Sequence, residues 1–218
     1  GATTTRSRGR AVVAVVAVVG VLVLIGLAGC GGDGVRQDGG RQAAPAAVPA
    51  PFGDCAELTA APPIPSGSAA GTAPAGARPL PSVTLDCMAD GTRVATAQIK
   101  GPAVVNLWAS WCAPCRSELP AFQRLGERAA GRIHVVGVDT RDDRAAAVDL
   151  ADQLGLTFPS LADPDQKVLA GLARPGLPVT VFVDSQGKVR HIYNGKALDE
   201  ASLTALVRQH LEVAVPVG

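Results

Sequence analysis

The feature that most restricts the fold is a pair of cysteines, Cys112 and Cys115, between a predicted strand and a predicted helix. Residues 103–109, AVVNLWA, form a short apolar run rich in β-branched side chains, which is typical of a buried strand. Residues 113–130 are predicted to form a helix that contains Pro120, where we expect a kink. The fold must therefore place a C-x-x-C pair on a strand-to-helix turn.

This position of Cys112 favours reversible disulfide exchange. A helix N-terminus offers free backbone N–H groups and a partial positive charge, and both stabilise a thiolate, which is the nucleophilic form of cysteine. Two intervening residues let Cys115 reach Cys112 within one helical turn, so that it can resolve a mixed disulfide formed there. Pro114 stiffens the turn between them.

A metal site is an alternative use of the pair. One C-x-x-C could be half of a zinc site, but a structural zinc ion needs four ligands. The sequence has no second C-x-x-C, and His134, His191 and His210 show no ligand spacing with the pair. We therefore expect no metal and no other cofactor. A static disulfide and inert buried cysteines are the remaining alternatives.

The rest of the apolar pattern predicts a single α/β domain. Strands are expected at 83–87, 92–96, 132–139, 179–184 and 189–194, and helices at 141–155, 164–173 and 198–213. Asp199 is a suitable N-cap for the last helix. This order of elements predicts a mixed central sheet flanked by helices.

The first thirty residues are typical of a secretory signal. Arg6, Arg8 and Arg10 precede an uncharged apolar run at 11–29, which ends at Cys30. The last residues, LAGC, resemble a bacterial lipobox, which implies that Cys30 carries lipid and anchors the protein on the outer face of the cytoplasmic membrane. A transmembrane anchor and ordinary cleavage are the alternatives. All three place the remainder outside the cytoplasm.

The next segment is predicted to be a tether. Residues 31–80 are rich in Gly, Ala and Pro and lack hydrophobic periodicity, so they cannot bury enough apolar surface to offset the cost of ordering. Within them, the FGDCAEL segment carries Cys55. We therefore divide the chain into a signal at 1–30, a flexible tether at 31–80 and a folded domain at 81–218.

Two stretches, VVNLWASWCAPCRSELP at 104–120 and GLPVTVFVDSQGKV at 176–189, resemble the thioredoxin superfamily. More narrowly, they resemble the TlpA-like branch of extracytoplasmic thiol-disulfide oxidoreductases, which are tethered to the membrane. The resemblance implies a thioredoxin-like fold. It also implies that Cys112 is the attacking cysteine and Cys115 the resolving one.

The resemblance assigns further roles around this pair. Pro178 matches a cis-proline that faces the cysteines, and Leu177 would offer backbone hydrogen bonds to a substrate strand. Trp111 would form part of the substrate-facing surface, with packing as the alternative. Glu118 would tune cysteine acidity and accept a proton, unless it is a solvated helix residue. Asn106 stands where cytoplasmic thioredoxins bury an aspartate, so proton transfer would fall to Glu118 or to water.

Cys55 and Cys87 are predicted to form a structural disulfide. Disulfides persist outside the cytoplasm, and this one would tie FGDCAEL to the first hairpin. Closing a loop of about 33 residues stabilises a fold by roughly 3.5 to 4 kcal/mol in the chain-entropy model. The alternative is a second exchange pair.

These observations predict a membrane-tethered, extracytoplasmic thiol-disulfide oxidoreductase. The resemblance favours a reductase of exported proteins, for example apocytochrome c, that draws electrons from a membrane thiol carrier. The alternatives are an oxidase that installs disulfides in secreted proteins and a copper-binding module of the same fold, because a C-x-x-C motif is compatible with either direction of electron flow. The formal net charge of +1 gives no general attraction to nucleic acid. We expect a monomer.

Overall fold

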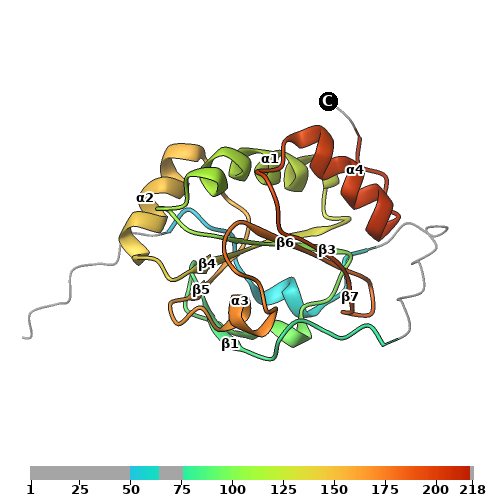
Figure 1. Ribbon diagram of the computed structural model, residues 1–218, viewed down its shortest axis with the longest axis horizontal. Coiled ribbons are helices and arrows are strands. Elements are labelled where there is room, and N and C mark those ends of the chain that lie inside the picture. The colour runs from blue at the N-terminus through green and yellow to red at the C-terminus, as the bar shows by residue number, and fades with distance from the viewer. Residues whose placement is uncertain (1–49, 64–75, 217–218) are drawn as a thin grey trace, which may run out of the picture. The chain divides into compact units, whose positions relative to one another are not determined.

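The computed structural model describes residues 50–63 and 76–216 (Figure 1). The predicted signal, Cys30 and much of the predicted tether lie outside these residues. Within the described part of the chain, no helix is both long enough and apolar enough to cross a membrane.

A seven-stranded mixed sheet forms the centre of the domain, with the strand order β2-β1-β5-β4-β3-β6-β7. The strands are β1 (Thr84–Cys87), β2 (Arg93–Ala95), β3 (Ala103–Trp108), β4 (His134–Thr140), β5 (Ser160–Asp163), β6 (Val179–Val183) and β7 (Val189–Tyr193). The pairs β3–β4 and β4–β5 are parallel and the other pairs are antiparallel. The predicted α/β fold with a mixed sheet is confirmed.

Helices cover both faces of this sheet. They are α1 (Ala113–Ala129), α2 (Arg144–Leu154), α3 (Lys167–Gly171) and α4 (Glu200–Leu211), with short 3-10 turns at Ala56–Thr59 and Thr96–Gln98. In Figure 1, α1, α2 and α4 lie over one face and α3 lies on the opposite face. Every residue of β3 is buried, because β3 has neighbours on both edges and helices over its faces.

Local sequence explains where the helices begin and end. The Asp143 carboxylate accepts hydrogen bonds from two backbone N–H groups at the start of α2, and Gly155 ends that helix at a φ of 63°. Asp199 caps α4, as predicted, by accepting from the N–H of Ser202. Helix α1 continues through Pro120 as a single element.

The folded domain includes residues ahead of the predicted boundary at 81. Phe52 packs in the core beneath α1, while Cys55 and Leu58 pack in the core on the other side of the sheet. The N–H of Gly53 donates to the carbonyl of Thr157. Assigning this part of 31–80 to a flexible tether was therefore wrong, because the FGDCAEL segment supplies apolar side chains to both cores.

Candidate active site

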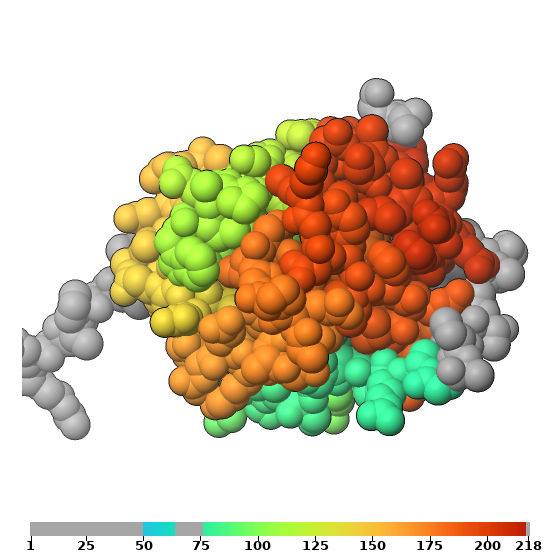
Figure 2. All heavy atoms as spheres, viewed as in Figure 1, coloured from blue at the N-terminus to red at the C-terminus, as the bar shows by residue number. Residues whose placement is uncertain are grey.

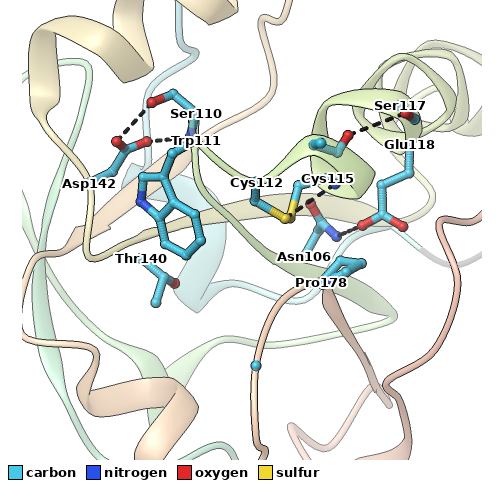
Figure 3. The surroundings of a disulfide bond; sticks show 12 residues. Asn106, Ser110, Trp111, Cys112, Cys115, Ser117, Glu118, Thr140, Asp142 and Pro178 are labelled. Atoms are coloured by element: carbon cyan, nitrogen blue, oxygen red, sulfur yellow. Dashed lines mark hydrogen bonds between the residues drawn. A yellow bond between two sulfur atoms is a disulfide. The ribbon is translucent and has the colours of Figure 1, made fainter.

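A disulfide joins Cys112 and Cys115 at the N-terminus of α1, with their Cα atoms 5.3 Å apart (Figure 3). Cys112 is the N-cap residue, and its sulfur accepts a hydrogen bond from the N–H of Cys115 at 3.3 Å. Cys112 keeps 5% of its surface exposed, whereas Cys115 keeps none. An incoming thiol or disulfide can therefore reach Cys112 but not Cys115, and the helix N-terminus stabilises a thiolate there.

The loop before β6 brings Pro178 to the same place. The peptide bond between Leu177 and Pro178 is cis. Because Leu107 of β3 pairs with Val179 of β6, Pro178 lies beside the end of β3. From that end of β3 the chain continues to Cys112. Figure 3 shows Pro178 on this loop, near the disulfide. In Figure 2 the surface of the α1 segment (green) borders the segment that leads into β6 (orange).

Glu118 lies one helical turn after Cys115 and faces inward. Only 1% of its surface is exposed, so the alternative of a solvated helix residue is wrong. Its Oε1 accepts a hydrogen bond from Asn106 Nδ2 at 2.7 Å, and its Oε2 accepts one from the N–H of Leu198 at 2.9 Å. Burial raises the pKa of Glu118 to about 7, and the two hydrogen bonds offset only part of this effect. A carboxyl group with this pKa can both accept and release a proton near neutral pH.

Trp111 lies at the surface, directly before Cys112. Its side chain is 62% exposed, and among residues 50–63 and 76–216 it is the only large hydrophobic side chain that is exposed. Its indole Nε1 donates to the carbonyl of Arg141 at 2.9 Å, which fixes the ring while leaving its surface free. A core-packing role for Trp111 is therefore wrong, and the exposed ring beside Cys112 is suited to contact a partner.

Comparisons with known proteins agree with this geometry. The AhpC/TSA family matches residues 77–192, which is more than half of the chain. The chain belongs to the AhpC/TSA family. The predicted thioredoxin-like resemblance is thereby confirmed.

Individual relatives indicate the chemistry of the domain. The chain is 36% identical over 117 residues to the thiol:disulfide interchange protein DsbE of Pseudomonas aeruginosa, a match that covers 52% of this chain and 63% of that protein. It is 29% identical over 119 residues to the thiol-disulfide oxidoreductase ResA of Geobacillus thermodenitrificans, covering 51% and 62%. The matches thus span less than two thirds of either relative.

A solved structure agrees with these relatives. A secreted disulfide oxidoreductase of Mycobacterium tuberculosis, homologous to DsbE of E. coli, has a TM-score of 0.53 and 25% identity, covering 59% of this chain and 96% of that one. Together with the cysteine geometry, these likenesses show that the domain around the C-x-x-C pair is similar to the domains of thiol-disulfide oxidoreductases.

Sequence reasoning missed the loop that follows β4 in this AhpC/TSA domain. The backbone N–H and the hydroxyl of Ser110 both donate to the carboxylate of Asp142, the hydroxyl at 2.8 Å. Asp139, at the end of β4, is buried, and burial together with the nearby Asp142 charge raises its pKa to about 8. This loop holds the segment that leads to Cys112. The sequence feature that could have indicated this loop is the acidic cluster DTRDD at 139–143, at the end of β4, which is parallel to β3.

A second missed residue, Asn194, fixes the cis-proline loop. Its Nδ2 donates to the carbonyl of Gly176 at 3.0 Å and to the carbonyl of Pro178 at 2.7 Å. Leu177, between them, is only half-buried. No local sequence signal indicates Asn194, because its partners lie 16 and 18 residues away.

Cys55 and Cys87 form a disulfide on the opposite side of the sheet, with Cα atoms 6.0 Å apart. The two residues are 1% and 0% exposed. A second exchange pair would need a sulfur that an attacking thiolate can reach. The burial of both sulfurs therefore supports a structural role.

Within residues 50–63 and 76–216, no group of three or more His, Cys, Asp or Glu side chains is arranged to hold a metal ion.

Proposed function

We propose that the protein is an extracytoplasmic thiol-disulfide oxidoreductase that exchanges disulfides with other exported proteins. The observation that carries this proposal is the asymmetric cysteine pair: Cys112 is partly accessible at a helix N-terminus, and Cys115 is buried behind it. Thiolate attack needs an accessible, stabilised sulfur, and resolution needs a second sulfur in reach but protected from other partners.

In the reducing direction, the Cys112 thiolate attacks one sulfur of a substrate disulfide. The substrate disulfide breaks, its other sulfur leaves as a thiolate, and a mixed disulfide forms on Cys112. The Cys115 thiol then loses its proton and attacks the Cys112 sulfur, which releases the second substrate sulfur and closes the Cys112–Cys115 bond. Glu118, with a pKa of about 7, accepts the Cys115 proton and returns it to solvent or to the leaving thiolate.

Substrate binding would involve the surface around Cys112. The Trp111 ring is exposed beside this cysteine and supplies an apolar contact. The half-buried Leu177 would offer backbone groups to an extended substrate segment, as a strand edge does. We propose that Trp111 and Leu177 contact the substrate, while Pro178 shapes the loop against the cysteines.

The direction we favour is reduction of exported proteins, including apocytochrome c, with electrons from a membrane thiol carrier. The likeness to DsbE and ResA supports this choice. The test is the reduction potential of the Cys112–Cys115 pair in the full chain, equilibrated in glutathione or dithiothreitol buffers. A value of about −270 mV would support a reductase, and one of about −120 mV would support an oxidase instead. A pair that does not cycle would contradict the enzyme proposal.

We further propose that lipid on Cys30 holds the protein at the outer face of the cytoplasmic membrane as a monomer. The LAGC sequence supports this anchor. Labelled fatty acid should be incorporated into the full chain and not into a Cys30→Ser variant, and that variant should leave the membrane fraction. Retention of the variant in the membrane without label would indicate a transmembrane anchor.

A further inference from the structure

The side chain of Asn106 has one satisfied end and one unsatisfied end. Asn106 lies in the middle of β3, is completely buried, and contacts Glu118 of α1. Its Nδ2 donates to Glu118 Oε1, whereas its Oδ1 is buried without a hydrogen-bond partner in the described structure. Buried polar atoms in proteins are nearly always paired, so an unpaired one needs a physical explanation.

The hydrogen bond to Glu118 fixes which end of Asn106 faces the cysteines. Because Asn106 Nδ2 donates to Glu118 Oε1, the amide nitrogen points toward that carboxyl group. The amide oxygen then points in the opposite direction. Figure 3 shows the Asn106 nitrogen toward Glu118 and its oxygen on the side of the Cys112–Cys115 disulfide.

A donor for this oxygen forms when the disulfide is reduced. An external dithiol supplies two electrons and two protons: the Cys112–Cys115 bond breaks, the external pair becomes a disulfide, and Cys115 acquires an S–H group. The thiol lies at a residue with no exposed surface, where water cannot serve as the acceptor. The disulfide has no S–H, so the same oxygen stays unpaired in the oxidised form.

We propose that Asn106 Oδ1 accepts a hydrogen bond from the Cys115 thiol in the reduced protein and thereby shifts the redox equilibrium toward the dithiol. This inference rests on the proposed exchange function. The shift has two sources: reduction creates a hydrogen bond, and it removes an unsatisfied buried acceptor. Asn106 thus makes the pair more oxidising than an apolar residue at this position would.

The first test measures the equilibrium between the full-length protein and dithiothreitol. Asn106→Leu preserves size but removes the acceptor, and we expect the equilibrium constant for reduction to fall about tenfold, which equals about 30 mV toward more negative potential. Asn106→Asp should retain the wild-type value within about threefold, because the introduced carboxyl group, when protonated, can donate to Glu118 while its other oxygen faces Cys115. An unchanged constant in Asn106→Leu would overturn the proposal.

A matched control separates this bond from a general loss of buried polarity. Ser160 is completely buried on β5, two strands away from β3, and its hydroxyl donates to the carbonyl of Phe158. Ser160→Ala should leave the equilibrium constant unchanged. An equal shift in Ser160→Ala and Asn106→Leu would overturn the proposal, because the shift would then reflect loosened packing.

The second test observes the thiol directly. In a full chain carrying Cys30→Ser and Cys112→Ser, with Cys55 and Cys87 paired, Cys115 is the one free thiol in the sequence. Its S–H stretching band in the infrared should move to higher frequency when Asn106→Leu is added, and stay lowered with Asn106→Asp. Identical bands with and without the Asn106→Leu substitution would refute the hydrogen bond. This background cannot exchange disulfides, so its result is independent of whether the proposed function holds.

Discussion

Replacing Glu118 by glutamine is expected to flatten the pH dependence of stability. Burial raises the pKa of Glu118 from 4.5 to about 7 in the folded protein. Below pH 4.5 the carboxyl group is protonated in both the folded and the unfolded chain, so its ionisation contributes no difference. Between pH 4.5 and 7 the unfolded chain releases this proton while the folded chain retains it, so the free energy of unfolding falls as pH rises.

The size of this effect follows from the two pKa values. The difference between the folded and unfolded pKa values corresponds to about 3 kcal/mol of stability lost by neutral pH. Between pH 4.5 and 7 the free energy of unfolding falls by about 1.4 kcal/mol per pH unit. Denaturant unfolding of the oxidised full chain at several pH values measures this slope. Glu118→Gln should remove that part of the slope. Its absolute stability is a poorer measure, because glutamine cannot accept both hydrogen bonds that Glu118 accepts.

A control variant and a refuting result complete this experiment. Glu57 is exposed, so Glu57→Gln should keep the wild-type slope. Asp139, whose pKa is raised to about 8, contributes a slope of the same sign in every variant and therefore cancels from the comparison. Parallel stability curves for the wild type and Glu118→Gln would show that burial does not hold the proton on Glu118.

Three further outcomes follow from the described contacts. The double variant Cys55→Ser/Cys87→Ser should lose about 4 kcal/mol of unfolding free energy in urea. Its disulfide exchange rate should stay unchanged, because the Cys55–Cys87 bond lies across the sheet from the active site. A loss of exchange activity would instead favour a second exchange pair. Asp142→Ala should lower unfolding free energy by about 1 to 3 kcal/mol, since the N–H and hydroxyl of Ser110 lose their acceptor; an unchanged Tm would contradict this. Trp111→Ala should raise the KM for a disulfide substrate while changing stability by less than about 0.5 kcal/mol, because the ring is exposed; a large drop in Tm with unchanged KM would show a packing role.

The sequence determined the local features of the active site. A β-branched apolar run, a C-x-x-C pair and a helical run are contiguous, so their order alone predicted a cysteine pair at a helix N-terminus. The N-cap role of Asp199 was equally local. The alternation of strands and helices was sufficient for the α/β class and the mixed sheet. The sequence did not predict β5, because its four residues directly follow Pro159 and show little periodicity.

Only the tertiary structure decided which distant groups meet at the cysteines. The carboxylate of Glu118 meets the N–H of Leu198, 80 residues further along the chain, and Ser110 meets Asp142, 32 residues away. The packing of α1 on β3 also places Asn106 against Glu118, with one end of its amide unpaired. Such contacts depend on how strands align and helices pack, and the pattern of residues along a single segment carries no record of that alignment. The charge state of Glu118 and the environment of Cys115 are therefore properties of the fold, whereas the cysteine pair itself is a property of the sequence.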